Sequence, residues 1–356
     1  MYFNKQYSLL IGTLRILSKL FDFRPKHQNI DLLTVNSVLI LDYQQIGDIV
    51  VSTGFIRDLK IKYPHLEISI KGLPFLNDIL EHDNHISKVY FDKGGWLNRW
   101  FAARKVTEKF DLVICPRGDI RDIIIGRAYS KKWLISFDFT GGNLFLDAVV
   151  PPGIMDHIAK RQIQLGRYLG IYQQDHKYTY ELKVPVSRED KYPSNNIAIH
   201  IGSSRKLRQL PKIELFQIID YLLNGGYFIT FFDAPGLEEG LIQELKERYN
   251  SKNLTIWSGK LADFILELPK YHSLITTDSA QSHMAAGWGM RTYVIFGPSK
   301  LEFCFPYGDK VSKIRKMDVT CSPCAQYKCS NSTHQFCYQG INRLLIEDLE
   351  FSLKAT

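Results

Sequence analysis

Short apolar runs that predict buried strands alternate with helical stretches twice along the chain. In the first half, the predicted strands cover residues 38–42, 66–71, 87–91, 111–115 and 132–136. In the second half, they cover residues 196–200, 227–232, 272–276 and 292–296. Strands that alternate with helices indicate parallel sheets with right-handed crossovers. We therefore expect an α/β protein with two doubly wound, Rossmann-like domains that face a central cleft.

Helical patterns fill the segments between these strands. They extend to about Lys62 after the first strand, and then cover residues 96–109, 119–129, 211–224, 237–249, 279–288 and 341–354. The helix over 211–224 carries the clearest end signals, with Pro211 at its first position and Gly225-Gly226 after its last.

A polar segment with two prolines separates the two halves and indicates an interdomain linker. We expect a first domain over residues 31–184, a linker over 185–195, a second domain with a cysteine-rich tail over 196–340, and a C-terminal helix over 341–356. Residues 1–30 predict an amphipathic helix, with leucines at helical spacing among basic residues. Such a helix could lie on a membrane surface or pack on its own domain.

Charge and hydropathy narrow the class of protein. The 45 Lys and Arg residues outnumber 37 Asp and Glu residues, which gives a net charge of +8 and favours an anionic partner. Nucleic acid is not expected, because no basic helix with interleaved aromatic residues is present. No stretch of about 20 uncharged residues predicts a membrane span, and no secretory signal is recognisable. We expect a cytoplasmic protein that could be peripheral on the inner face of the cytoplasmic membrane.

Three loops at strand ends contain candidate functional residues. Strand ends are where these are expected, because ligands of such sheets bind outside the carboxyl ends of the strands. Asp48 follows a Gly at a helix start, where its carboxylate could be a general base or merely an N-cap. The loop from Gly202 to Arg208 holds two serines and three cations, which suit phosphates but also a solvated loop. Asp278 and Gln281 have capping-box spacing, so a helix with an anion-binding N-terminus is predicted there.

Together these segments resemble glycosyltransferase family 9, the ADP-heptose:lipopolysaccharide heptosyltransferases. The resemblance covers about residues 36–340 and rests on the Gly-Asp48 loop, the loop 202–211, the Asp-Ser-x-x-x-His segment from Asp278, and Phe296-Gly-Pro-Ser. It implies a GT-B fold with the acceptor on the first domain and the nucleotide sugar on the second. It also implies an inverting transfer that requires no metal cofactor.

The resemblance assigns roles to individual residues. Asp48 matches the catalytic base, and the donor nucleotide sugar is expected at Ser203, Ser204, Arg208, Glu238, Asp278, Ser279, Ala280 and His283. Arg208 stands where many members have Lys, and a planar guanidinium binds phosphate with different geometry. Ala280 replaces the usual Gly, so its methyl group could crowd the pyrophosphate. His283 could equally be an ordinary core or surface histidine.

An anionic, lipid-linked acceptor such as Kdo-lipid A or the inner core fits the basic first domain. Nine cations and four acids lie within residues 97–132, and Arg117 and Arg121 follow a strand end. We expect these two arginines to bind acceptor carboxylates or phosphates.

Four of the six cysteines form a cluster, namely Cys321, Cys324, Cys329 and Cys337. Four closely spaced thiolates could bind a structural Zn²⁺. Disulfides are the alternative, although a reducing cytoplasm disfavours them.

The expected function is transfer of a heptose from ADP-heptose to the inner core of lipopolysaccharide or lipooligosaccharide. The alternatives are a transferase that uses another nucleotide sugar for a cell-surface glycan, and a non-catalytic protein that binds nucleotide sugars.

Overall fold

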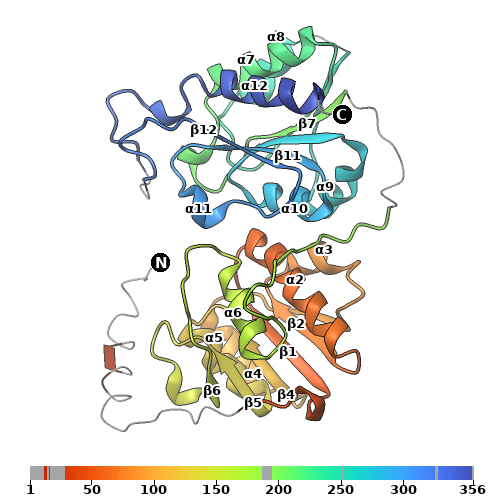
Figure 1. Cartoon of the computed structure of the whole chain (residues 1–356), viewed down its shortest axis with the longest axis vertical. Helices are drawn as coiled ribbons and strands as arrows, with labels where there is room; N and C mark the ends of the chain where they lie inside the picture. The colour runs from red at the N-terminus through yellow and green to blue at the C-terminus, as the bar shows by residue number, and fades with distance from the viewer. Residues whose placement is uncertain are drawn as a thin grey trace. The chain divides into compact units, whose positions relative to one another are not determined.

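The computed structural model describes residues 12–13, 16, 29–186, 195–249, 252–324 and 328–354. The chain forms two compact units, Met1–Tyr180 and Glu181–Thr356, and each is described by itself (Figure 1). Nearly all of the predicted N-terminal helix over 1–30 and most of the predicted linker over 185–195 lie outside the described residues. Of the helices that are described, none combines the length and apolar character needed to cross a membrane.

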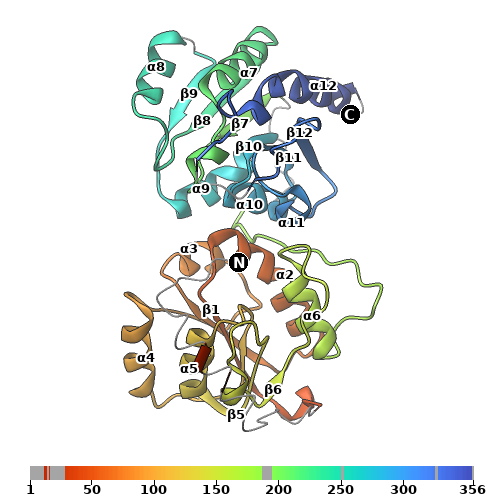
Figure 2. The same ribbon diagram turned by 90° about the vertical axis from the view of Figure 1, so that its left-hand side faces the viewer.

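Unit 1 contains one parallel sheet with the strand order β3-β2-β1-β4-β5-β6. Its strands are β1 (Ser37–Asp42), β2 (Glu67–Gly72), β3 (Lys88–Phe91), β4 (Phe110–Cys115), β5 (Ser130–Ser136) and β6 (Ala148–Val149). Its α-helices are α2 (Ile46–Lys62), α3 (Leu76–Leu80), α4 (Trp96–Arg104), α5 (Ile120–Tyr129) and α6 (Lys160–Tyr168). The helices cover both faces of the sheet, with α4 and α5 on one side and α2 and α6 on the other (Figure 2).

Unit 2 repeats this plan with the strand order β12-β11-β10-β7-β8-β9. Its strands are β7 (Asn196–His200), β8 (Phe228–Phe232), β9 (Leu254–Trp257), β10 (Ser273–Thr277), β11 (Arg291–Phe296) and β12 (Val311–Arg315). Its α-helices are α7 (Lys212–Asn224), α8 (Leu241–Arg248), α9 (Leu261–Glu267), α10 (Ala280–Trp288), α11 (Leu301–Cys304) and α12 (Ile341–Lys354). The prediction of two doubly wound α/β domains is confirmed, and α12 packs beside α7 (Figure 1).

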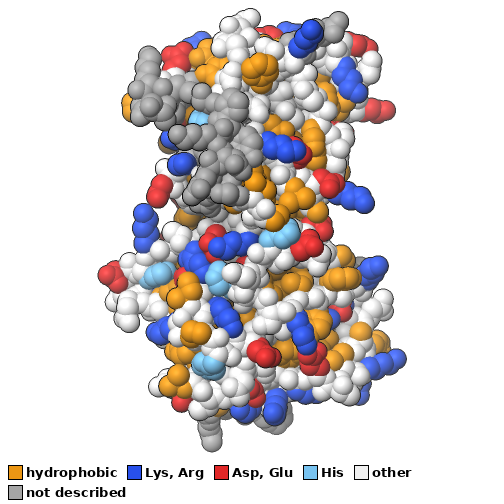
Figure 3. Space-filling model, turned by 90° about the vertical axis from the view of Figure 1, so that its right-hand side faces the viewer, with side chains coloured by type: hydrophobic (Ala, Val, Ile, Leu, Met, Phe, Trp, Pro, Cys, Tyr) orange, Lys and Arg blue, Asp and Glu red, His pale blue; other side chains and the backbone are white. Residues whose placement is uncertain are grey.

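Burial of the central strands explains why their sequences are continuous apolar runs. Every residue of β4 and β10 is buried, as are five of the six residues of β1. Strands covered by helices on both faces cannot alternate polar and apolar residues. The face of the molecule drawn in Figure 3 intermixes basic and acidic side chains.

Two predicted helices differ from the structure at their ends. The helix expected over 96–109 ends at Arg104, because the chain must extend again before the buried Phe110 opens β4. The helix expected over 237–249 begins at Leu241, since Gly240 has a φ of 79° in the left-handed region, which a helix cannot continue through.

The end of unit 1 packs closely on α2. The hydroxyl group of Tyr178 accepts a hydrogen bond from the Phe55 amide at 3.0 Å and donates one to the carbonyl oxygen of Val51. Because Val51 and Phe55 are four residues apart, this hydroxyl is inserted into the hydrogen-bond ladder of the helix. Gly54 permits the approach, since a Cβ there would lie 2.0 Å from the Thr179 carbonyl oxygen.

This contact predicts the effect of a single methyl group. We expect Gly54→Ala to lower the free energy of unfolding by about 1–3 kcal/mol, because backbone atoms must move to admit the Cβ. Gly95→Ala is the matched control, since a Cβ there meets nothing within 4 Å. Urea unfolding of both variants measures the difference, and equal stability would contradict the packing described.

Candidate active site

Both sheets bring strand ends together where the strand order reverses direction. In unit 1, β1 lies between β2 and β4, and in unit 2, β7 lies between β8 and β10. In the sheet of unit 1, the loops that leave β1 and β4 therefore begin side by side. In the sheet of unit 2, the same holds for the loops that leave β7 and β10. Ligands of doubly wound sheets bind at such points.

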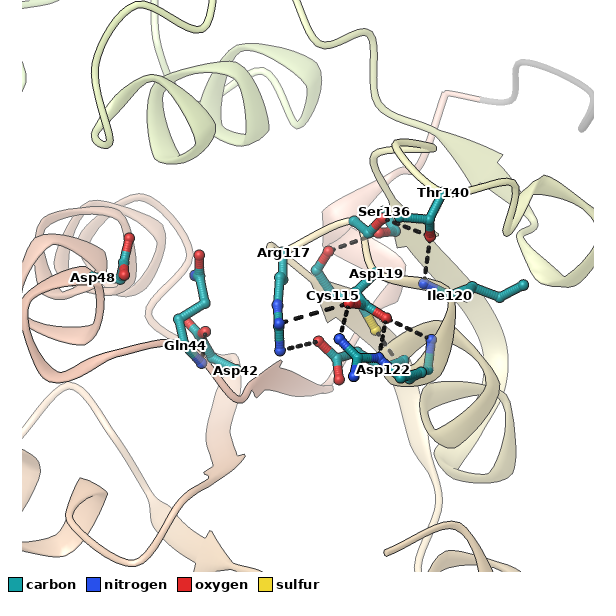
Figure 4. Close-up of polar contacts among 12 residues, drawn as sticks. Asp42, Gln44, Asp48, Cys115, Arg117, Asp119, Ile120, Asp122, Ser136 and Thr140 are labelled. Carbon is teal, nitrogen blue, oxygen red and sulfur yellow. Dashed lines mark hydrogen bonds and ion pairs between the residues drawn. The ribbon is translucent and has the colours of Figure 1, made fainter. Parts of the chain in front are cut away.

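Asp48 lies in the first turn of α2, immediately after β1. The N-cap position is Gln45 rather than Asp48, so capping the helix does not account for this carboxylate. Its side chain is 25% exposed, and its Oδ1 lies 4.0 Å from a guanidinium nitrogen of Arg161 in α6. Figure 4 shows Asp48 on the same side of the site as Asp42 and Gln44.

The surroundings of Asp48 raise its pKa to about 6. Burial is the main cause, the charge of Arg161 opposes it, and the carboxyl group of Asp42 adds to it. A carboxylate with a pKa near the working pH accepts a proton more readily than an ordinary Asp and is still ionised at neutral pH. The group is therefore suited to general base chemistry.

The arginines predicted to bind the acceptor lie in one cluster after β4. Arg121 forms two hydrogen bonds to Asp119, with Nε to Oδ1 at 2.8 Å and a terminal nitrogen to Oδ2 at 2.5 Å. Arg117 is held more loosely, at 3.7 Å from Asp119 and 3.8 Å from Asp122 (Figure 4). Arg117 therefore retains more hydrogen-bonding capacity for an anion than Arg121 does.

Asp122 adds a second perturbed carboxyl group to this cluster. Burial raises its pKa to about 7, and the charge of Arg117 acts in the opposite direction. Its Oδ2 is buried and forms no hydrogen bond within the part of the chain that the structure describes. The net charge of this cluster therefore depends on whether the Asp122 carboxyl group is ionised.

In unit 2, Asp278 follows β10 and connects two loops. Its Oδ2 lies 3.1 Å from Arg208 in the 3₁₀ helix η4 (Lys206–Arg208) and accepts a hydrogen bond from Ser299. The capping-box prediction for Asp278 is wrong. The N-cap of α10 is Ser279, without a side-chain cap bond, and the Asp278 carboxylate is engaged by Arg208 and Ser299 instead.

The other predicted donor residues lie at the ends of the adjacent strands β7 and β10. Ser203 and Ser204 occupy the loop between β7 and η4, and the Ser203 hydroxyl oxygen accepts a hydrogen bond from the Arg205 amide at 3.4 Å. Ser279 and Ala280 open α10, where amide N–H groups lack intrahelical acceptors and favour anions. His283 lies one turn further and is buried.

Glu238, which was predicted to bind the donor, lies in the segment between β8 and α8. It is exposed and pairs with Lys212 at 3.0 Å. Together with Lys206, Pro211 and Gln335, it lines a cavity of about 450 Å³.

The cysteine-rich segment holds the loops after β7 and β11 in place, which the sequence did not indicate. Tyr338 donates a hydrogen bond to the Arg208 carbonyl oxygen at 2.8 Å, and Gln335 donates to the carbonyl oxygens of Leu207 and Gln209 at 3.2 and 3.1 Å. On the other side, Ser322 donates to the Gly297 carbonyl oxygen at 2.6 Å.

The four clustered cysteines are free thiols that line one small cavity of about 20 Å³. The Cys321 sulfur accepts a hydrogen bond from Asn331, and the Cys329 sulfur accepts one from the Gln335 amide, both at 3.3 Å. Within the described ranges, no three His, Cys, Asp or Glu side chains are placed to hold a metal ion. These residues as placed thus do not assemble the zinc site, which stays a prediction.

Comparisons with known proteins identify the family of the chain. Residues 99–334 match the model of glycosyltransferase family 9 (heptosyltransferase). The chain is 34% identical over 306 residues to a lipooligosaccharide heptosyltransferase 2 of Campylobacter jejuni serotype O:2, covering 82% of this chain and 90% of the relative. A heptosyltransferase 2 of serotype O:6 is 33% identical over 304 residues, with the same coverage.

Solved structures share the fold at low sequence identity. The ADP-heptose lipopolysaccharide heptosyltransferase II of E. coli superposes with a TM-score of 0.71 at 15% identity, covering 88% of this chain and 97% of that chain. A glycosyltransferase family 9 protein of Veillonella parvula gives a TM-score of 0.70 at 19% identity, with 80% and 87% covered. The neighbours have the two-domain GT-B fold, and the family match and the curated relatives together show that this chain belongs to glycosyltransferase family 9, the heptosyltransferases.

Proposed function

We propose that the protein transfers a heptose from ADP-heptose to the inner core of lipooligosaccharide, with inversion at the anomeric carbon and Asp48 as general base. The observation that carries the proposal is the Asp48 carboxylate, which has a pKa of about 6 and lies just after β1, where the strand order of unit 1 reverses direction. The curated relatives are named lipooligosaccharide heptosyltransferases. A structural neighbour, the E. coli heptosyltransferase WaaC, was solved with ADP-2-deoxy-2-fluoro heptose.

The chemical step is a direct displacement. Asp48 accepts the proton of an acceptor hydroxyl group as its oxygen forms a bond to the anomeric carbon. The bond from that carbon to the diphosphate breaks on the opposite face, and ADP leaves with the electron pair. Negative charge then grows on the diphosphate, where Arg208, the two serines of the preceding loop and the N-terminus of α10 would stabilise it.

Electrostatics support an anionic acceptor on unit 1. Arg117 and Arg161 lie near the carboxyl ends of β4 and β1 and carry positive charge beside Asp48. Carboxylates or phosphates of Kdo-lipid A or of the inner core would complement them. Such an acceptor is anchored in a bilayer, so we also propose that the protein works at the inner surface of the cytoplasmic membrane.

Asp48→Asn tests the base assignment. We expect transfer to fall by about 10²–10⁴-fold, because the amide cannot accept the proton. ADP affinity should be retained, and Asp156→Asn, an exposed carboxylate of the same unit, is the matched control. Initial rates and calorimetric ADP titrations measure both quantities. Wild-type transfer by the Asn variant would remove Asp48 from the mechanism.

The pH dependence follows from the same group. Only ionised Asp48 accepts a proton, so kcat/KM should rise with pH through about 6 and reach its maximum near neutral pH. Steady-state rates between acidic and neutral pH measure this limb, and an unchanged rate well below pH 6 would be inconsistent with the assignment.

Arg208→Ala tests the donor site of unit 2. The variant loses a cation from the proposed phosphate site and leaves the buried Asp278 with a weaker set of partners, so we expect ADP to bind at least about tenfold less tightly. Arg248→Ala is a matched control, because Arg248 pairs with Asp220 at the same 3.1 Å on the exposed face of α8. Calorimetry compares the variants, and equal ADP affinity would argue against a phosphate role for Arg208.

A nucleotide panel separates this proposal from its alternatives. We expect ADP and ADP-sugars to raise the melting temperature more than UDP, GDP or CMP sugars, since a ligand of the folded state stabilises it by mass action. Selective stabilisation by another nucleotide would favour a transferase with a different donor. Binding of ADP-heptose without turnover would favour a non-catalytic binding protein.

A further inference from the structure

A buried hydroxyl group connects the end of β1 to the first turn of α2. The Ser52 oxygen lies 3.1 Å from Oδ2 of Asp42, 3.0 Å from the carbonyl oxygen of Asp48 and 3.0 Å from the amide nitrogen of Gln162. Asp42, Ser52 and Gln162 are 0%, 1% and 2% exposed, so water does not complete these contacts. The hydrogen atoms of the network must therefore come from the residues themselves.

The number of protons available to the three contacts of Ser52 determines which protonation state of Asp42 satisfies them all. The Gln162 amide donates to Ser52, and Ser52 has a single proton to donate. If Asp42 is ionised, Asp42 and the Asp48 carbonyl compete for that proton, and one contact is lost. If Asp42 carries a proton on Oδ2, it donates to Ser52, which then donates to the Asp48 carbonyl. Only the neutral acid makes all three contacts hydrogen bonds.

The other contact of Asp42 is compatible with the neutral form. Its Oδ1 accepts a hydrogen bond from the Gln44 amide at 3.2 Å, which either protonation state permits. The Gln44 side chain in turn accepts a hydrogen bond from Arg161, the same guanidinium that faces Asp48. Asp42 thus reaches the surroundings of Asp48 along two routes.

The charges around Asp42 point the same way. The groups that interact with it are Asp48 from α2, Asp122 from α5, the Cys115 thiol from β4 and the Arg161 guanidinium from α6. Burial raises the pKa of Asp42, while Arg161 and the hydrogen bonds oppose the shift. Arg161 is the one cation among these groups and also faces Asp48, so a further carboxylate charge at Asp42 is poorly compensated.

We propose that Asp42 stays protonated at neutral pH and acts as a positioning residue, whose proton keeps Ser52 bonded to the Asp48 carbonyl and so fixes the turn that carries the base. The inference deepens the proposed function and rests on it for the role of Asp48. When Asp42 ionises, Ser52 turns toward it, and the first turn of α2 loses this bond.

The test compares two substitutions of Asp42. Asp42→Asn retains a donor to Ser52 and an acceptor for the Gln44 amide, so we expect transfer to stay within about threefold of the wild-type rate. Asp42→Ala removes both, and we expect kcat to fall by about tenfold or more with little change in KM for ADP-heptose. If the Asn variant loses as much activity as the Ala variant, the negative charge of Asp42 is required and the proposal is wrong.

The alkaline side of the pH profile provides a readout that a merely structural role would not change. The wild type should lose activity as Asp42 ionises, whereas Asp42→Asn should keep its rate at the same pH. Identical alkaline limbs in the two proteins would overturn the proposal.

Carbon-13 NMR of aspartate-labelled protein separates this inference from the proposed function. The signal that disappears in Asp42→Asn should report a neutral carboxyl group at pH 7 in the protein without substrate. An ionised Asp42 would refute the inference whatever the enzyme transfers. A neutral Asp42 in a protein without transferase activity would instead refute the proposed function.

Discussion

The parallel order of the two sheets is the constraint on which the rest of the structure depends. All strands of a parallel sheet end at the same edge, so loops far apart in sequence begin beside one another there. In unit 1 this places Asp42, the last residue of β1, and Asp48, which follows it, near Arg117, which follows β4. In unit 2 it places the Ser203 loop beside Asp278. In each unit the sheet topology, rather than a local sequence motif, brings the candidate site residues together.

The balance of charges within unit 1 then sets the pKa of Asp48, the proposed base. Three buried or half-buried carboxyl groups, Asp42, Asp48 and Asp122, all have raised pKa values, and three arginines oppose these shifts, namely Arg117, Arg121 and Arg161. Desolvation disfavours the charged form of each acid, and each ionised carboxylate makes ionisation of its neighbours less favourable. The most exposed of the three, Asp48, is the one best able to exchange a proton with a substrate. In unit 2 the balance is different, because the buried Asp278 is paired with Arg208 and fixes the loop that carries it.

Sequence patterns predicted the parts of the fold that are fully buried. The central strands are continuous apolar runs, whereas β9 and β12 at the edges of unit 2 are half exposed and were not predicted. Asp48 was found because it follows a Gly at a strand end. Arg161 was not, since it lies 117 residues from its partner Gln44 and no local pattern marks it. The capping box at Asp278 was predicted from spacing alone, and a tertiary ion pair determined the outcome instead. Tyr338 and Gln335 hold the loop after β7 through contacts between residues more than 120 positions apart, which no local pattern indicates.

Product analysis with defined substrates tests the proposed heptose transfer most directly. The purified protein is incubated with ADP-heptose and a lipooligosaccharide acceptor truncated within its inner core, and the glycan is examined by mass spectrometry and by NMR of the new linkage. We predict that the acceptor gains one heptose and that its anomeric configuration is opposite to that of the donor. A product with the donor's configuration, or an acceptor left unchanged while ADP-heptose is bound, would contradict the central claim.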